Sequence, residues 1–334
     1  MPVPLSILDL AFVGPGQTAR DSFAGSVRLA QRAEALGYTR VWYAEHHNIP
    51  TIASSATSVL IAHVAAHTAR IRLGAGGIML PNHAPLMIAE QFGTLECLHP
   101  RRIDLGLGRA PGSDQVTMRA LRRNPSAADT FPEDVLELQA YLGAQSRLPG
   151  VEAIPGKGTN VPLYILGSSL FGAQLAAALG LPYAFASHFA PGALQDAVAL
   201  YRKQFRPSEQ LAQPYVIAGV NVVAADDASD AAAQFASVRR WRVRALLGRG
   251  RALTDAEADA LLESPEGRHL KQMGLYSAVG TATEVRDYLA KFARHADADE
   301  LITVHPSPTS AARLRSVELA AVAIPAATPE RVRE

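Results

Sequence analysis

The sequence lacks several features that would place the protein in a special class. Its one cysteine, Cys97, excludes an intramolecular disulfide and a cysteine-rich metal site. Its 32 basic and 31 acidic residues give a formal net charge of +1, so we expect no long-range attraction to nucleic acid or to an anionic membrane. No uncharged run approaches the roughly 18–20 residues that span a bilayer, and the N-terminus lacks a basic, then apolar, signal segment. A cytoplasmic protein without nucleic-acid or membrane partners is expected.

The composition provides enough apolar material for a large core. Hydrophobic residues make up 48% of the chain and charged residues 19%, which argues against disorder. A length of 334 residues is within the range of one α/β barrel with insertions. We therefore expect a single domain over residues 1–334.

Short apolar runs alternate along the chain with longer amphipathic segments. Eight such strand-and-helix units predict a closed (β/α)8 TIM barrel, with an open doubly wound sheet as the rival architecture. The predicted strands are Leu5–Phe12, Arg40–Tyr43, Ile71–Gly76, Arg102–Leu107, Leu163–Leu166, Tyr183–Ala186, Tyr215–Val223 and Leu301–Val304. The predicted helices are Ser22–Leu36, Ser54–Thr68, Ala84–Leu98, Pro132–Leu142, Leu170–Leu179, Ala193–Phe205, Asp226–Leu247 and Ser310–Val322.

The connection before the last strand is too long for one crossover, at about 75 residues. It contains a predicted helix at Thr254–Leu262, with Thr254 as N-cap, and another at Glu284–Ala293. We interpret about 248–279 as an insertion on the C-terminal face, over the mouth of the barrel. Residues 108–129 are expected to be irregular.

Active residues of such barrels lie where strands end at the C-terminal face. The sharpest short feature there is Glu45-His46-His47, after the second strand. One interpretation is a general acid or base, His46, beside an orienting carboxylate, Glu45. A metal site is disfavoured because the side chains of adjacent residues alternate along a strand, and we predict none. A loop histidine with a purely structural role also remains open.

Two other strand ends are suited to an anion. Gly167-Ser168-Ser169 precedes a helix whose free N–H groups favour phosphate, although simple N-capping would explain the same residues. Arg109 follows the fourth strand and offers a charged fork for phosphate oxygens, although it could equally be a surface residue. Together they predict a local phosphate site.

The run Gly74-Ala75-Gly76-Gly77 ends the third strand. Glycines here would permit close approach of a flat ligand or an unusual backbone such as a non-proline cis peptide; a tight turn is the alternative. The run is not a dinucleotide fingerprint, because Gly-x-Gly-x-x-Gly is absent and no helix follows directly.

These pieces, in this order, resemble the bacterial luciferase-like family of flavin-dependent monooxygenases, in its single-subunit oxidoreductase branch. The resemblance extends over roughly residues 3–322. The segments that carry it are Val41–His47, Ile71–Pro81, Pro85–Gln91, Arg101–Arg109, Leu166–Ser169 and Leu179–Ala186.

The resemblance implies a barrel enzyme that uses FMN. In this family reduced flavin, supplied by an NAD(P)H:flavin reductase, reacts with O2 to give a C4a-hydroperoxide that oxygenates a small organic substrate. By the same resemblance, Arg109 holds the FMN phosphate with Gly167, Ser168 and Ser169. Gly76-Gly77 matches a non-prolyl cis peptide beneath the flavin ring, and His46 matches the catalytic histidine.

The resemblance also leaves alternatives open. Gly108 stands where luciferase carries a reactive cysteine, which argues against light emission. A deazaflavin (F420)-dependent hydride-transfer enzyme would share the fold and the phosphate site. A non-catalytic flavin-binding subunit is a third possibility, against which the retained His46 and Arg109 argue. The family further implies a homodimer, with the alanine-rich second and third helices as the expected interface.

Overall fold

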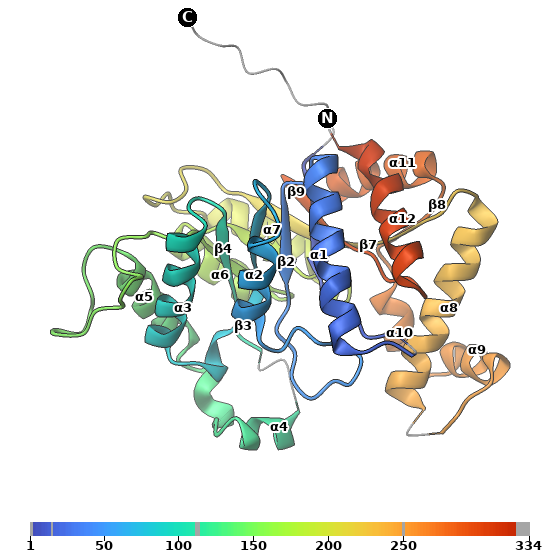
Figure 1. The fold of residues 1–334 in the computed structure, drawn as a ribbon, viewed down its shortest axis with the longest axis horizontal. Helices are drawn as coiled ribbons and strands as arrows, with labels where there is room; N and C mark the ends of the chain where they lie inside the picture. The colour runs from blue at the N-terminus through green and yellow to red at the C-terminus, as the bar shows by residue number, and fades with distance from the viewer. Residues whose placement is uncertain (1–2, 15, 111–113, 249–250, 325–334) are drawn as a thin grey trace, which may run out of the picture.

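Eight parallel strands close into a barrel in the computed structural model, which describes residues 3–14, 16–110, 114–248 and 251–324 (Figure 1). The hydrogen-bonded order runs β1-β2-β3-β4-β5-β6-β7-β9 and returns from β9 to β1. The predicted TIM-barrel fold is therefore confirmed, and the open sheet is wrong. The strands are β1 (Leu5–Asp9), β2 (Arg40–Tyr43), β3 (Arg72–Met79), β4 (Ile103–Gly108), β5 (Leu163–Gly167), β6 (Tyr183–Phe185), β7 (Val216–Ala224), β8 (Ser277–Gly280) and β9 (Glu300–Val304).

Helices follow the strands and pack around the outside of the barrel (Figure 1). None of those in the described ranges is both long and apolar enough to cross a bilayer. They are α1 (Ala19–Leu36), α2 (Thr57–Ala65), α3 (Pro85–Leu98), α4 (Gln115–Ala120), α5 (Phe131–Leu142), α6 (Leu170–Leu179), α7 (Leu194–Gln204), α8 (Ala228–Leu247), α9 (Asp255–Glu263), α10 (Arg268–Met273), α11 (Ala282–His295) and α12 (Ser310–Ala320). Short 3-10 turns lie at Leu80–Asn82, Pro125–Ala128 and Ala321–Ala323.

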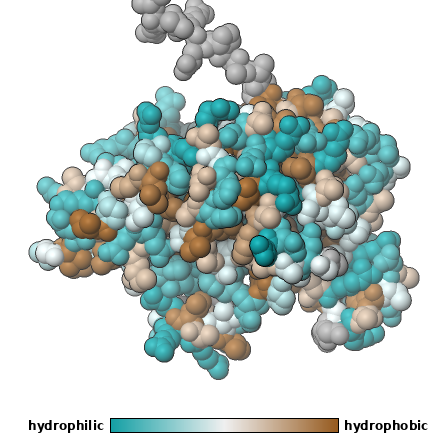
Figure 2. Space-filling view, in the orientation of Figure 1, coloured by the Kyte–Doolittle hydropathy of each residue, from teal (hydrophilic) through white to brown (hydrophobic). Residues whose placement is uncertain are grey.

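The apolar residues of the strands divide between two cores, as the alternation of strand side chains requires. One set packs outward against the helices, while a smaller set, including Leu8, Trp42, Ile217 and Ile302, fills the barrel interior. On the face shown in Figure 2, hydrophilic and apolar residues are interspersed. The largest apolar side chains of the strands, such as Trp42, Tyr183 and Phe185, are buried.

Several element boundaries differ from the predictions for local reasons. β1 ends at Asp9 rather than Phe12, because Ala11 is left-handed (φ 48°) and its N–H donates to the Asp9 carboxylate at 2.7 Å. The segment 108–129, predicted to be irregular, contains α4, which Asp114 caps through the Thr117 N–H at 2.7 Å. The expected helix after Thr254 is present as α9, with a complete capping box from Glu257.

The segment predicted as an insertion contains one strand that sequence periodicity did not reveal. β8 pairs in parallel with the last part of β7, outside the closed barrel. Before it, α9 and α10 pack on α8 around Val243, Leu262 and Leu270. Residues 249–250 of this segment lie outside the described residues. In Figure 1, α4, α9 and α10 lie at the lower edge, with the connections that follow β1 and β2. This edge is therefore the C-terminal face of the barrel.

A buried ion network fills the opposite, N-terminal end of the barrel. Arg40 donates to Asp104 at 2.8 Å and to Glu300 at 3.0 and 3.1 Å, and both acids are fully buried. Five further groups complete the network: the hydroxyls of Tyr164, Tyr215 and Ser6, the Arg72 guanidinium and the Trp42 indole N–H. Two guanidinium groups thus face two carboxylates, and the network joins most strands around the barrel.

We expect Arg40→Met to lower the free energy of unfolding by about 3–5 kcal/mol, because it leaves two buried carboxylates without their main counter-charge. Urea denaturation followed by circular dichroism measures the change. The matched control is Arg32→Met at the exposed Arg32–Glu318 pair, where we expect a loss below about 1 kcal/mol. Equal losses in the two variants would contradict the importance of the network.

Candidate active site

Glycines line the wall of the barrel where β3 meets β4 near the C-terminal face. A Cβ atom on Gly106 would lie 2.3 Å from the Ala75 carbonyl oxygen, and one on Gly77 would lie 2.7 Å from the Gly106 carbonyl oxygen. The Gly76–Gly77 peptide is cis, the geometry that the family resemblance implies at this position. Backbone rather than side chains therefore forms this part of the wall, as a flat ligand would need.

The carboxylate of Glu45 ties the end of β2 to the connection between β3 and α3. Its Oε2 accepts the Met79 backbone N–H at 2.9 Å, and His83 Nε2 lies 3.0 Å from both carboxylate oxygens. Its Oε1 also accepts from the Asn82 amide at 3.2 Å and pairs with His47 Nε2 at 2.8 Å. The side chain is only 1% exposed, so these contacts are made away from water.

The ionisation of Glu45 follows from these partners. Burial opposes the charge, but hydrogen bonds from His47 and His83 and from the Met79 N–H outweigh it and lower the pKa of Glu45 to about 2. The hydrogen bond between Glu45 and His47 also raises the pKa of His47 above its usual value. Glu45 is thus an ionised anchor, and His47 supports it.

His46 differs from its two neighbours in having an unsatisfied buried atom. Its Nδ1 is buried and has no hydrogen-bond partner among the described residues. Desolvation lowers the pKa of His46, so the imidazole is neutral near pH 7. A buried ring nitrogen without a partner costs free energy, and a bound ligand could satisfy it.

A second neutral histidine lies near His46, after β6. Burial and the charges of Arg242 and His46 lower the pKa of His188 to about 3. Its Nδ1 also has no partner in the described part of the chain. The ring packs directly on Gly219 of β7, where a Cβ would lie 2.4 Å from Nδ1. The mouth of the barrel therefore holds two uncharged imidazoles with unsatisfied nitrogens.

The predicted phosphate residues meet at the start of α6. The Arg109 guanidinium stacks on the ring of Phe171 at 4.1 Å, in the first turn of that helix. Ser169 is the N-cap, but its side chain makes no capping hydrogen bond, and the first turn carries no acidic residue. The helix N-terminus and the cation thus face the same region, which is favourable for an anion.

The structure brings the predicted residues into two groups: Glu45, His46, Gly76 and Gly77 at the ends of β2 and β3, and Arg109 with Gly167, Ser168 and Ser169 at the ends of β4 and β5.

The expectation that Glu45 orients His46 is not what the hydrogen bonds show, because the described partners of Glu45 are His47, His83, Asn82 and Met79. Within the described ranges, no group of three or more histidine, cysteine or acidic residues could hold a metal ion.

Sequence reasoning places His83 and His188 after strand ends at the C-terminal face but gives them no role, and it missed Arg242. His83 and His188 follow strand ends, which was a usable signal, but so does His305, which is fully buried between Thr303 and Ser316. Only the three-dimensional contacts distinguish histidines at the candidate site, such as His83 and His188, from a structural histidine such as His305. Arg242 lies in the middle of a helix, where the sequence gives no hint of a site.

Comparison with known proteins gives a consistent result. The sequence model of a family described as luciferase-like monooxygenase matches residues 3–300. A luciferase-like monooxygenase of Escherichia coli (strain K12) is 49% identical over 321 residues, covering 95% of this chain and 96% of the relative. The N-acetyl-S-alkylcysteine monooxygenase of Bacillus subtilis (strain 168) is 40% identical over 195 residues, covering 55% and 57% of the two chains.

Solved structures extend the likeness to the whole fold. The crystal structure of apo-MsnO8 superposes with a TM-score of 0.86 and 37% identity, covering 96% of this chain and 98% of that one. Two more distant structures share the fold alone. The oxygenating constituent of 3,6-diketocamphane monooxygenase with FMN, from a plasmid of Pseudomonas putida, has a TM-score of 0.68 and 16% identity, covering 97% of this chain and 98% of that one. An F420-dependent secondary alcohol dehydrogenase has a TM-score of 0.72 and 15% identity, covering 98% of this chain and 100% of that one. The chain belongs to the luciferase-like monooxygenase family.

Proposed function

We propose that the protein is an FMN-dependent monooxygenase that uses reduced flavin and O2 to oxygenate a small organic substrate. The observation that carries the proposal is that the mouth of one barrel holds a cationic helix N-terminus, at Arg109 and α6, together with a neutral histidine, His46. The helix N-terminus with Arg109 suits the phosphate of a cofactor, and His46 suits proton transfer beside the ring of that cofactor. The family membership supports the same reaction class.

The FMN phosphate would bind between Arg109 and the first turn of α6. The guanidinium presents parallel N–H groups to phosphate oxygens, and the backbone N–H groups after Ser168 and Ser169 have no helical acceptors. Phe171 holds the Arg109 side chain in place by its ring contact. Because the whole protein is nearly neutral, this local arrangement supplies the attraction for the phosphate.

The flavin ring would lie against the glycine wall at Gly76-Gly77. Any side chain at Gly77 or Gly106 would collide with backbone, so the chain presents a smooth surface there. Gly108, the position of a reactive cysteine in luciferase, would bring a Cβ to 3.0 Å from Met79 Sδ. Because residue 108 is glycine, this point of the wall carries no thiol.

His46 would move a proton at its free Nδ1. Its lowered pKa keeps it neutral, so it can accept a proton at neutral pH. Glu45 does not take this proton, because a carboxylate with a pKa of about 2 is a poor base at pH 7. We assign Glu45 to positioning: it fixes the loop that carries His46.

Reduced FMN would supply the electrons that activate O2 at its carbon C4a, and an NAD(P)H:flavin reductase would deliver it. The protein must then keep water from the ring. The segment 248–279 would cover the mouth, which is supported by the packing of its helices α9 and α10 on α8, the helix that follows β7 at the C-terminal face. A homodimer through α2 and α3 is also proposed; Val59 (68% exposed) and Met87 (56% exposed) offer apolar contacts on these helices.

The second candidate is an F420-dependent hydride-transfer enzyme. The fold shared with an F420-dependent secondary alcohol dehydrogenase supports this second candidate, because the proposed phosphate site would bind the phosphate of either cofactor. The two proposals differ in the use of oxygen. Binding of FMN and of F420, together with oxygen consumption by each reduced complex, separates them.

We expect Arg109→Ala to raise the dissociation constant of FMN about 10- to 100-fold, because it removes a charge-assisted fork from the phosphate. Fluorescence titration of FMN measures the change. The matched control is Arg147→Ala on an exposed loop, where we expect less than a twofold change. Unchanged affinity in Arg109→Ala would place the phosphate elsewhere.

We expect His46→Ala to leave FMN affinity within about threefold and to slow the oxygen reaction of bound reduced FMN at least about 100-fold. The reaction is followed by rapid mixing with O2. Since burial lowers the pKa of His46, the wild-type rate should fall as the ring becomes protonated, with a midpoint below the ordinary histidine value of 6.5.

The control is His63→Ala, an exposed residue on α2, which should keep both the rate and its pH profile. A wild-type rate that falls with a midpoint above the ordinary histidine value of 6.5, or a His46→Ala profile identical to wild type, would remove His46 from the proton transfer.

A further inference from the structure

Arg242 is a partly buried cation that has no acidic partner among the described residues. It lies on α8, and its Nη2 donates to Asn221 Oδ1 at 3.3 Å. Among the described residues it forms no ion pair, whereas Arg240 and Arg244 on the same helix pair with acids of α9. Desolvation lowers the pKa of Arg242, with no carboxylate to oppose it. A guanidinium held out of water in this way would gain from a bound anion.

The contacts of Arg242 place it beside the candidate active site. Asn221 comes from β7 and donates to the His188 carbonyl oxygen at 2.7 Å. His188 in turn interacts electrostatically with both Arg242 and His46. Arg242 thus reaches from α8 to the same end of the barrel as the proposed catalytic histidine, with Asn221 and His188 between them.

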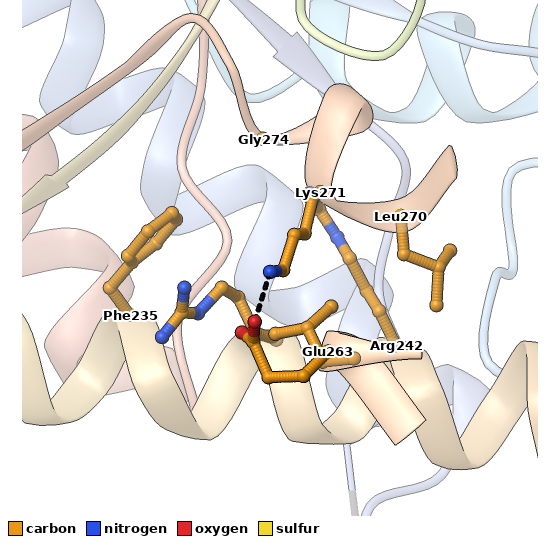
Figure 3. Close-up of a pocket in the computed structure, with 8 residues that line it drawn as sticks. Phe235, Arg242, Glu263, Leu270, Lys271 and Gly274 are labelled. Atoms are coloured by element: carbon orange, nitrogen blue, oxygen red, sulfur yellow. Dashed lines mark hydrogen bonds and ion pairs between the residues drawn. The ribbon is translucent and has the colours of Figure 1, made fainter. Parts of the chain in front are cut away.

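A cavity of about 320 Å³ adjoins Arg242 between α8, α9 and α10. Three cationic side chains line it, Arg239, Arg242 and Lys271, against one carboxylate, Glu263. Figure 3 shows the Lys271 amino group pointing to Glu263, with which it pairs, so this acid is already engaged. The cavity therefore has an excess of positive charge and room for a small organic molecule only.

We propose that Arg242, with Asn221 beside it, is a specificity-determining residue that binds the carboxylate of an anionic substrate. This inference rests on the proposed function, since it names the substrate class of that enzyme: a small organic acid whose carboxylate binds Arg242, on the side of Asn221 and His188 away from His46. A guanidinium fits a planar carboxylate through two parallel N–H donors, and the side-chain Oδ1 of Asn221, which accepts from Nη2, holds the guanidinium in position.

The test uses butyrate as the probe and its neutral isostere butyramide as the comparison, with the full-length protein free of cofactor. At constant ionic strength, 100 mM butyrate in place of chloride should raise the thermal unfolding midpoint of the wild type by about 2 °C, because a ligand that binds only the folded state stabilises it. Butyramide should raise it by less than about 0.5 °C. In Arg242→Gln the response to butyrate should disappear.

Two controls make the result specific. Arg239→Gln removes a cation from the same helix and cavity, but its side chain contacts the Phe235 ring at 5.3 Å rather than Asn221, so it should keep the butyrate response. Arg242→Lys keeps the charge and should keep part of it. Nuclear magnetic resonance titration of butyrate gives the dissociation constant directly and should show at least a tenfold increase in Arg242→Gln.

The proposal is overturned if butyrate stabilises Arg242→Gln as much as the wild type, if butyramide is equally effective, or if butyrate has no effect on the wild type. Butyrate bound only at Arg109 and α6 would give the first of these outcomes. Because the experiment contains no flavin, its failure leaves FMN binding and the oxygen reaction untouched. Conversely, loss of FMN binding with an intact butyrate response would overturn the proposed function but not the anion site.

Discussion

The closed barrel depends on the ion network around Arg40. Its members come from strands far apart in the sequence: Arg40 belongs to β2, Asp104 to β4 and Glu300 to β9, the strand that closes the barrel onto β1. The two acids are fully buried, so each needs its guanidinium partner, and this need fixes how the strands are placed around the axis. Two tyrosine hydroxyls and the Trp42 indole N–H complete the hydrogen bonds at this end.

The two ends of the barrel differ in how completely their polar groups are satisfied. At the N-terminal end the buried charges of Arg40, Asp104 and Glu300 all have close partners, which serves stability. At the C-terminal end Glu45 is satisfied, but within the described ranges the Nδ1 atoms of His46 and His188 have no hydrogen-bond partner and Arg242 has only the Asn221 amide oxygen. In a barrel whose function lies at the C-terminal face, unsatisfied groups at that face are what a ligand would complete. Glu45 serves both stability and the candidate site, since it is a buried, fully hydrogen-bonded carboxylate directly before His46 in the chain.

Much of the fold follows from sequence periodicity because strands and crossover helices have distinct patterns. The eight barrel strands were predictable as apolar runs, and the helix after Thr254 as a capping signal. β8 was not, because its four residues carry no alternation that separates them from a loop. The positions of two candidate site residues were equally predictable: His46 and Arg109 follow strands, and strand ends meet in a barrel. Arg242 was not, because its role depends on Asn221 and His188, which are distant in the sequence and ordinary in type.

The most direct test of the whole account is a crystal structure of this protein with FMN bound. The account predicts the phosphate between the Arg109 guanidinium and the first turn of α6, the ring against Gly76-Gly77, and His46 Nδ1 or a bound water at the reactive face of the ring. A phosphate bound away from Arg109, or a ring outside the mouth of the barrel, would contradict it.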